Sequence, residues 1–394
     1  MIEPDQIIYL DNNATTQLDP AVVEEMTPFL TKYYGNPSSP YGFGAQVRDA
    51  VELARERVAA LIGCIASEIT FTSGGTEANN TALNSALQLD PQRRHIVTTA
   101  VEHSATRRQC EHLARTGYEV SVVAVDEQGR IDLGEIAHAI RSDTAIVSVM
   151  WANNETGVLF PIPEIAHLAR EKRVLFHTDA IQAAGKIPID VGGAPVSYLS
   201  LSAHKIHGPK GVGALYVNRR VAFRPSSFGG EQENTRRAGT ENVASIVGFG
   251  KAAERAAVEL SIQDDRVRKM RDDFERAILA AVPNAVINGD PMNRLPNTSS
   301  ISFRGVEATA ALILFDQQGL CCSAGSACRS GSPELSHVLR AMEADEQQMR
   351  GSIRFSFGHF SSDSDLKRGI DVVLRVMAQL RRTRTTTTRG RDFS

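Results

Sequence analysis

The sequence predicts an α/β protein with a mainly parallel central sheet and a second, smaller α+β domain. Short apolar runs alternate with amphipathic stretches between residues 40 and 211. Polar residues follow most of these runs, and in open α/β sheets the ligand crevice lies at the carboxyl ends of the strands. Near Glu241 this alternation gives way to a long helical pattern.

Each expected strand is a short run rich in Val, Ile, Thr and Phe, which is typical of strands buried in a parallel sheet. In chain order the runs are EITFTSG, HIVTTAVEH, YEVSVVAVD, TAIVSVMWANNE, VLFHTDA and YLSLSAHK. Helices are expected in YGFGAQVRDAVELARERVAALIG and PIPEIAHLAREKR. In the first of these, apolar residues recur at near-helical spacing at Val47, Val51, Leu53, Ala54, Val58 and Leu61.

The second half predicts a different arrangement. A helical pattern runs to about Ala281 and is followed by the strand NTSSISF, the helix EATAALILFDQQG, the strand SIRFSFG and a final helix. We therefore expect a large domain at residues 15–255 and a small domain formed by residues 1–14 and 256–380. Residues 381–394 are rich in Arg and Thr and low in complexity, which predicts a disordered, solvated tail rather than a polyanion-binding one.

Composition excludes several classes of protein. The chain carries 43 basic and 46 acidic side chains and a formal charge of -3, so nucleic acid or membrane is not expected as its main partner. No apolar run approaches the roughly 18 residues of a transmembrane span, and the N-terminus lacks the pattern of a signal peptide. Five cysteines argue against a disulfide framework. We expect a soluble protein of the reducing cytoplasm.

The stretch FTSGGTEAN places Gly74 and Gly75 between a strand and a helix that begins near Thr76. Glycines allow the backbone to approach an anion, and a helix N-terminus offers free N–H groups. The alternative is an ordinary strand–helix turn. No Walker-type lysine follows, which argues against a nucleoside triphosphate.

Two more strand ends carry charged groups. Asp179 ends the run LFHTD, where a carboxylate either caps the following turn or partners a buried cation. Lys205 follows the run YLSLS, and a lysine held at a strand end in a crevice can act as an amine nucleophile. Lys210, flanked by Gly and Pro, is the expected solvated lysine of the same stretch.

A phosphate cradle, an acid and a lysine in this order suit pyridoxal 5′-phosphate. That cofactor needs an anion site, a carboxylate at its ring nitrogen and a lysine for the Schiff base. No resident metal is expected, because Cys321 and Cys322 are adjacent and lack a second CxxC pair.

Nine motifs, in order along the chain, resemble those of the cysteine desulfurases, most closely the nitrogen-fixation type. They are YLDNNATT, GNPSS, TSGGTEAN, VEH, SVMWANNETG, HTDAIQ, SAHKIHGPKG, RRAGTEN and GSACRSGS. The resemblance covers roughly residues 9–380. It implies the fold-type I architecture of pyridoxal-phosphate-dependent transferases (the class V aminotransferase family) and a homodimer.

The resemblance assigns cofactor contacts to Gly75, Thr76, His103, Asp179, Gln182, Ser202, His204, Lys205 and Thr240. Lys205 would carry the cofactor as a Schiff base, Asp179 would pair with the ring nitrogen, and Gln182 would approach the ring oxygen. Thr240 would reach the phosphate of the other subunit. His103 would stack on the ring and take part in proton transfer, although without the other motifs it would be interpreted as a satisfied histidine at a strand end.

The substrate carboxylate would be held by Asn154 and Arg354. Guanidinium suits this task because it can engage a carboxylate through two parallel hydrogen bonds. The alternative interpretation of Arg354 is a surface arginine on an edge strand.

The resemblance places the catalytic nucleophile at Cys328 of GSAC, in a segment rich in Ser, Gly and Ala that we expect to be mobile. Arg329 would favour the thiolate. Cys321 and Cys322 depart from the family pattern and are either buried at a strand end or sulfur relays. Cys64 and Cys110 lie in helical contexts and are expected to be packed and inert.

The function implied is conversion of L-cysteine to L-alanine with a persulfide left on Cys328, which passes to an iron–sulfur scaffold protein. An aminotransferase or a selenocysteine lyase of the same fold is the alternative enzyme. Neither an aminotransferase nor a cofactor-free sulfur carrier would need the whole set of Lys205, Asp179 and a loop cysteine.

Overall fold

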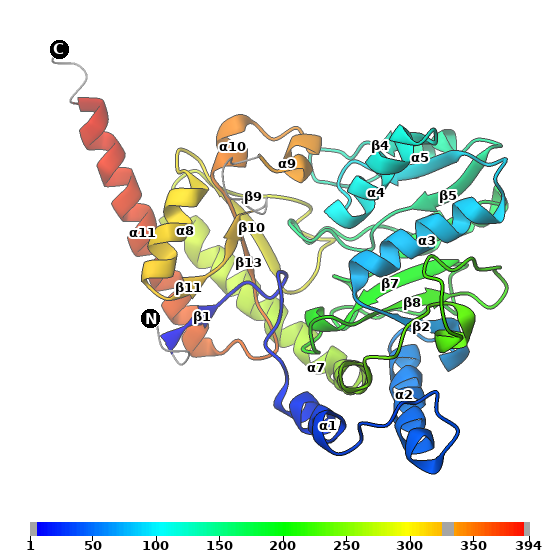
Figure 1. Cartoon of the computed structure of the whole chain (residues 1–394). Helices are drawn as coiled ribbons and strands as arrows, with labels where there is room; N and C mark the ends of the chain where they lie inside the picture. Colours follow the sequence, from blue (N-terminus) through cyan, green and yellow to red (C-terminus); the bar gives the residue numbers. More distant parts are fainter. Residues whose placement is uncertain (1–5, 325–334, 390–394) are drawn as a thin grey trace.

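The two larger β-sheets lie side by side and divide the molecule (Figure 1). The structure, a computed structural model, describes residues 6–324 and 335–389. A seven-stranded sheet forms one half and a four-stranded sheet forms the other, and the long helix α7 (Val243–Ala281) runs between them.

The large sheet confirms the predicted α/β class. Its strands, in the order β2-β8-β7-β6-β5-β3-β4, are β2 (Ile69–Thr72), β8 (Gly213–Val217), β7 (Tyr198–Ser202), β6 (Leu175–Asp179), β5 (Thr144–Ser148), β3 (His95–Thr99) and β4 (Glu119–Val123). Neighbouring strands are parallel except for β8, which is antiparallel to both β2 and β7. Strand β8 was not among the six expected strands, because GVGALYV follows the loop of Lys205 without a helix between them.

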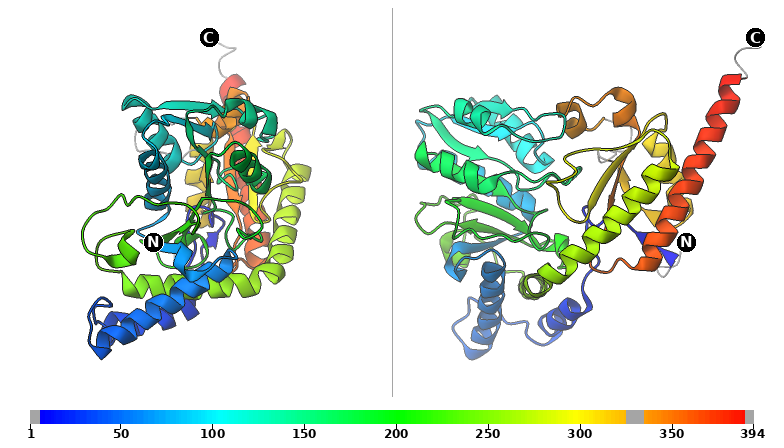
Figure 2. Two further views of the ribbon diagram at one scale, coloured as in Figure 1. Left: turned by 90° about the vertical axis from the view of Figure 1, so that its right-hand side faces the viewer. Right: turned by 180° about the vertical axis from the view of Figure 1, so that it is seen from behind.

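The helices described before α7 pack around this sheet, except the first, which packs against α7 (Figure 2). They are α1 (Pro20–Thr31), α2 (Gly42–Leu61), α3 (Gly75–Leu89), α4 (Ser104–Arg115), α5 (Leu133–Ala139) and α6 (Ile162–Glu171). The apolar stripe predicted on α2 is buried at Val47, Val51, Ala54, Val58 and Leu61. Leu53 is an exception at 46% exposure, because it lies one position outside the stripe that faces α7.

The second half contains the four-stranded antiparallel sheet, in the order β12-β13-β10-β9. Its strands are β9 (Ala285–Ile287), β10 (Thr298–Phe303), β12 (Ser323–Ala324) and β13 (Ser352–Ser356). The helices here are α8 (Ala308–Gln317), α9 (His337–Ala341), α10 (Glu346–Arg350) and α11 (Asp363–Arg389). A separate apolar core, which includes Phe274, Phe315 and Phe355, fills this half.

The N-terminal segment connects the halves. Strand β1 (Ile8–Tyr9) pairs in parallel with β11 (Leu320–Cys321), and the chain then crosses to the carboxyl edge of the large sheet. The predicted division between residues 255 and 256 falls inside α7, one continuous helix that contacts α1 and α2 as well as α11, β9 and β10. The domain boundaries stay a prediction.

The end of the chain differs from the sequence prediction. Helix α11 continues to Arg389 and projects away from the body, so residues 381–389 are helical where low complexity predicted disorder (Figure 2). Adding residues to an existing helix costs far less than nucleating one, which explains how a Thr-rich segment can continue it. Residues 390–394 lie outside the described part of the chain.

We predict that Gly250→Ala destabilises the fold. A Cβ atom at Gly250 would lie 2.4 Å from the Cα atom of buried Ala54, so α7 and α2 would have to separate. Overpacking of this kind costs about 1–3 kcal/mol in the free energy of unfolding, measurable by urea denaturation. Gly42→Ala, where a Cβ atom meets nothing within 4 Å, is the matched control. Equal stability of the two variants would contradict the packing argument.

Candidate active site

Five parallel strands bring the predicted residues to one edge of the large sheet. Strands β2, β3, β5, β6 and β7 all point the same way, so their carboxyl ends meet at that edge. The residues that follow these strands are Gly75 and Thr76, His103, Asn154, Asp179 and Gln182, and Ser202, His204 and Lys205.

Lys205 lies in a short 3₁₀ turn after β7. Its Nζ atom donates to the backbone oxygens of Asn13 at 2.6 Å and Ala14 at 2.7 Å. The pKa of Lys205 is lowered to about 8, chiefly by burial and then by the nearby Arg354, with Asp11 and Asp179 acting in the opposite direction. Lys210 is exposed, as predicted for the solvated lysine of this stretch. The lowered pKa therefore increases the fraction of neutral, nucleophilic amine at Lys205 near neutral pH.

Asp179 ends β6 and is 4% exposed. Its Oδ1 atom accepts from the backbone N–H of Ile181 at 3.0 Å, which is the turn-capping contact considered for this residue. Its Oδ2 atom accepts from Nδ2 of Asn79, on α3, at 2.6 Å. The carboxylate is thus fixed in place by two donors and remains available to a cation or a protonated ring nitrogen.

The glycine turn provides room for an anion. Helix α3 begins at Gly75, and its first N–H groups have no intrahelical partners. A Cβ atom at Gly75 would lie 2.0 Å from Cδ1 of Ile181 and 3.6 Å from Cβ of Ser202, so a larger residue there would displace the Ile181 side chain. Thr76 and Ser202 therefore lie beside the same helix N-terminus. His204, whose Nδ1 atom is 3.2 Å from Oγ1 of Thr15, has its pKa lowered to about 4 by burial and neighbouring lysines.

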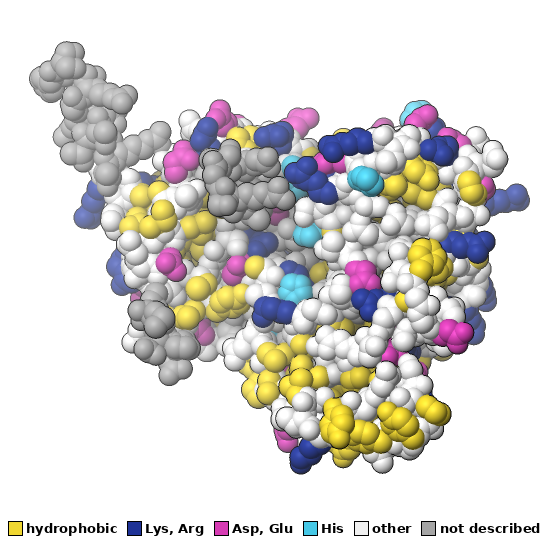
Figure 3. Space-filling model, viewed as in Figure 1, with side chains coloured by type: hydrophobic (Ala, Val, Ile, Leu, Met, Phe, Trp, Pro, Cys, Tyr) yellow, Lys and Arg dark blue, Asp and Glu magenta, His cyan; other side chains and the backbone are white. Residues whose placement is uncertain are grey.

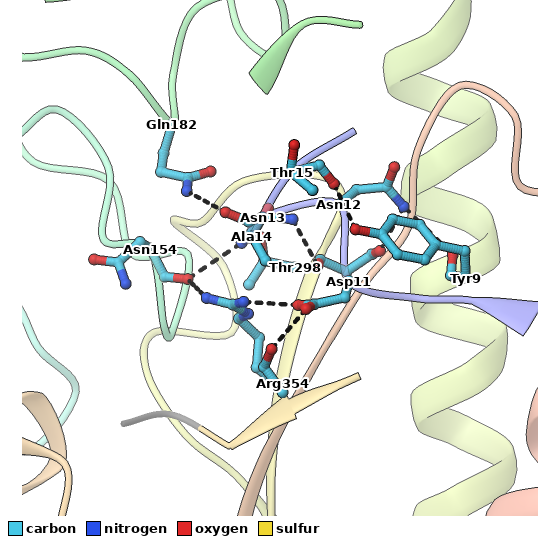
Figure 4. A network of polar contacts seen from close by, with 12 residues as sticks. Tyr9, Asp11, Asn12, Asn13, Ala14, Thr15, Asn154, Gln182, Thr298 and Arg354 are labelled. Carbon is cyan, nitrogen blue, oxygen red and sulfur yellow. Dashed lines mark hydrogen bonds and ion pairs between the residues drawn. The ribbon is translucent and has the colours of Figure 1, made fainter. Parts of the chain in front are cut away.

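The backbone oxygen of Asn13 links Lys205 to Gln182. It accepts from Nε2 of Gln182 at 2.9 Å (Figure 4), as well as from the lysine. The Asn13 side chain is itself fixed, because its Nδ2 atom donates to Oγ1 of Thr298 at 2.8 Å and its backbone N–H donates to Oγ of Ser356 at 2.9 Å. Both of those residues belong to the four-stranded sheet.

Arg354 approaches the same segment from β13. Its Nη2 atom pairs with Oδ1 of Asp11 at 2.7 Å, and its Nη1 atom donates to the backbone oxygen of Asn154 at 2.8 Å (Figure 4). Arg354 is 6% exposed, and β13 lies between β12 and β10, so the surface arginine on an edge strand is the wrong interpretation. The guanidinium Nε atom has no hydrogen-bond partner in the described part of the chain.

His103 is the N-cap of α4, where Nδ1 accepts from the backbone N–H of Ala105 at 3.2 Å. Its pKa is lowered by desolvation, with Asp179 opposing this effect and Lys205 adding to it. The imidazole therefore lies near both groups. Glu102 beside it is buried, and burial raises the pKa of its carboxyl to about 8.

The described cysteines are free thiols. Burial raises the pKa of Cys64 and Cys110 to about 12, which fits the predicted inert packing. Cys321 ends β11 and Cys322 follows it, and burial raises the pKa of both thiols. Cys328 and Arg329 lie outside the described residues.

Thr240 is exposed in the loop before α7, and no contact with the cradle of its own chain is present in the described structure. Its predicted reach to a second subunit stays a prediction.

Three residues of the site were not predicted from the sequence. Asn13 organises the contacts of Lys205 and Gln182, Asn79 holds Asp179, and Lys186 donates from Nζ to Oε1 of Gln182 at 2.7 Å. The signal for Asn79 was its position in the polar run GGTEANN, after an expected strand, whereas Asn13 lies in the polar run DNNATT, before which no strand was expected.

The residues present fit pyridoxal phosphate. A nucleophilic lysine, a fixed carboxylate and a glycine-lined helix N-terminus meet at one edge, and the buried Oδ1 atom of Asn79, beside Asp179, has no partner among the described residues. No cluster of three or more His, Cys, Asp or Glu side chains able to hold a metal ion occurs in residues 6–324 and 335–389. None of the helices described there is long and apolar enough to cross a membrane.

Comparisons with known proteins place the chain in one family. The chain matches the aminotransferase class-V family over residues 8–368. It is 49% identical over 375 residues to a cysteine desulfurase of Nostoc sp., a match that covers 95% of this chain and 94% of the relative. It is 50% identical over 375 residues to the cysteine desulfurase NifS of Azotobacter vinelandii, with 95% and 93% covered.

Solved structures of similar proteins have the same fold as this chain. A NifS-like protein superposes with a TM-score of 0.90 at 36% identity and covers 95% of this chain and 100% of its own. The structure of SspA in complex with cysteine superposes with a TM-score of 0.78 at 31% identity, with 90% and 99% covered.

We predict that cofactor loading of the apoprotein depends on pH through Lys205. Only the neutral amine attacks an aldehyde, so below the lysine pKa of about 8 the loading rate should rise about tenfold per pH unit and then level off. The measurement is the rate at which the yellow absorption of bound cofactor develops. Lys205→Ala should not load covalently, whereas Lys210→Ala should behave as wild type. A rate that still rises above pH 9.5 would contradict the lowered pKa.

Proposed function

Since this chain belongs to the class-V aminotransferase family and, within it, to the cysteine desulfurases, we propose that it converts L-cysteine to L-alanine and retains the sulfur as a persulfide on Cys328. The observation that carries this proposal is the meeting of a lysine amine, a fixed carboxylate and a buried guanidinium at one edge of the sheet. These are the groups that an amino-acid substrate and pyridoxal phosphate require.

Pyridoxal phosphate, when bound, supplies an aldehyde for the substrate amine and a ring that accepts the electron pair left by the α-proton. Thr76, Ser202 and His204 would hold its phosphate at the N-terminus of α3. Asp179 would keep a proton on the ring nitrogen, because its carboxylate is fixed at the end of β6. His103 would lie against the ring.

The substrate carboxylate would bind Arg354 and Asn154. Asp11 holds the guanidinium of Arg354 in place. Its Nε atom has no partner in the described chain and would be available to the carboxylate. Lys205 would then take the α-proton at Nζ, since its lowered pKa leaves a substantial neutral fraction at physiological pH.

The sulfur would move to Cys328. Its thiolate would attack the sulfur of the substrate, the substrate's carbon–sulfur bond would break, and the carbon fragment would take up protons to become alanine. Cys321 and Cys322 are poor candidates for the attack, because burial raises the pKa of each thiol and so disfavours the thiolate.

The persulfide would pass to an iron–sulfur scaffold protein, the acceptor that the family resemblance implies. A reducing compartment such as the cytoplasm suits an enzyme whose described cysteines are all free thiols. Both assignments are proposals about this chain.

We further propose a homodimer. Large hydrophobic side chains gather on one face over α1 and α2 and in the segment between them (Figure 3). Leu30, Tyr34 and Tyr41 are 66%, 80% and 55% exposed there, and contiguous apolar surface of this kind is typical of an interface. Thr240 is exposed and could reach the phosphate site of a partner.

We predict that Cys328→Ser abolishes alanine formation while the cofactor stays bound. A serine hydroxyl is a poor nucleophile without an adjacent base, so sulfur removal should fall by at least a hundredfold. Alanine is measured under reducing conditions, and persulfide is located by mass spectrometry. Cys322→Ser is the matched control and should keep most of the activity. Normal turnover by Cys328→Ser, with loss in the control, would identify a different nucleophile.

We predict that the double substitution Leu30→Glu and Tyr34→Glu converts a dimer into a monomer. Burying two unpaired carboxylates would cost more free energy of association than a typical interface residue contributes. Light scattering at micromolar concentration measures the mass. Met292→Glu, at a position that is 88% exposed elsewhere in the chain, should leave the dimer intact. A monomeric wild type would refute the dimer.

A further inference from the structure

Lys186 contacts Gln182 and Asn13, and Asn13 also contacts Lys205. Its Nζ atom donates to Oε1 of Gln182 at 2.7 Å and to Oδ1 of Asn13 at 3.3 Å. Both acceptors belong to residues next to the expected cofactor lysine, since Gln182 and Lys205 donate to the same backbone oxygen of Asn13. Lys186 thus contacts two residues of the site directly.

The two contacts determine which way the Gln182 amide points. An amide has an acceptor end and a donor end, and Nζ of Lys186 is the donor in both of its contacts. Lys186 therefore selects the orientation in which Oε1 of Gln182 faces Nζ and the NH₂ group faces the opposite way. One N–H of that NH₂ group is used by Asn13, and the second has no acceptor in the described part of the chain.

The neighbouring residues prevent the Gln182 amide from flipping. Gln182 is 5% exposed, so a flipped amide would leave its oxygen buried without a donor. Asn13 cannot turn away either, because its Nδ2 atom donates to Thr298 and its Oδ1 atom also accepts from Asn297 at 3.0 Å. A chain of fixed amides therefore leads from the four-stranded sheet to Gln182.

We propose that Lys186 is a positioning residue that fixes the Gln182 amide so that its free N–H donates to the ring oxygen of the bound cofactor. This inference rests on the proposed function, because it takes the cofactor as given. It goes beyond it by assigning a role to a second lysine that neither binds substrate nor carries the cofactor.

Burial lowers the pKa of Lys186 well below its usual value, and Lys205 and Arg354 lower it further. The role does not require a charge, because even a neutral amine has two N–H groups for the two acceptors. Lys186 and Lys205 also line a cavity of about 80 Å³ between α7 and residues 357–359. The titratable groups facing that cavity are Asp19, His207, Arg255, Glu259 and His359.

The test uses the pH at which the absorption of the bound cofactor changes. A donor to the ring oxygen stabilises its ionised form, so loss of that donor should raise the midpoint. In Lys186→Met holoenzyme we expect an upward shift of about one pH unit, the size of one lost hydrogen bond to a charged group. Cofactor content is measured first, because failure to bind cofactor in the wild type would refute the proposed function rather than this inference.

The variant Lys186→Gln distinguishes an effect of the Gln182 orientation from an effect of the Lys186 charge. Its neutral amide can still donate to Oε1 of Gln182, so its midpoint should stay near that of wild type. Lys186→Met should add no further shift in a Gln182→Leu background, because the amide to be oriented is then gone. Equal shifts in Lys186→Gln and Lys186→Met, or additive shifts in the double variant, would overturn the proposal in favour of a charge effect.

Exposed Lys210→Met is the control and should not change the midpoint. If Lys186→Met does not retain cofactor, a crystal structure of the wild-type holoenzyme decides the matter. The inference requires Nζ of Lys186 within hydrogen-bonding distance of Oε1 of Gln182, and the amide nitrogen within the same distance of the ring oxygen. Separation of either pair beyond 4 Å would overturn it.

Discussion

The backbone oxygen of Asn13 accepts hydrogen bonds from both Lys205 and Gln182, and the arrangement of the site depends on it. A carbonyl oxygen has two lone pairs, so one peptide group can hold two side chains from different loops. Those loops follow β6 and β7, which are adjacent and parallel. The sheet brings the two side chains near each other, and the carbonyl fixes the distance between them.

That carbonyl can serve this purpose because residues 11–16 are held from both sides. On the side of the four-stranded sheet, Asp11 pairs with Arg354 and accepts from Oγ of Ser323 at 2.7 Å. On the side of the large sheet, the backbone N–H of Thr16 donates to the oxygen of His204 at 3.0 Å. The segment therefore connects the expected carboxylate-binding arginine to the expected cofactor lysine. A shift of one half of the molecule relative to the other would change both positions together.

Much of this site could be predicted from the sequence, because strand ends are local features. Asp179 and Lys205 were located by the apolar runs that precede them, and parallel strands place such ends at one edge. Asn13 could not be found in this way, because its partners are 169 and 192 residues further along the chain. Only the assembled fold determines such contacts, and the same holds for the pairing of Arg354 with Asp11.

Burial is the main reason why the lysines of the site have lowered pKa values, and neighbouring positive charges add to it. Lys205 and Arg354 lower the pKa of Lys186, and Arg354 lowers that of Lys205, where Asp11 and Asp179 act in the opposite direction. A phosphate and a substrate carboxylate would add the negative charge that is lacking. Because opposite charges raise a lysine pKa, their arrival would make the protonated form of Lys205 more favourable as it accepts the α-proton. The ligand-free balance of charge thus prepares the lysine to attack, and the ligand-bound balance helps it to act as a base.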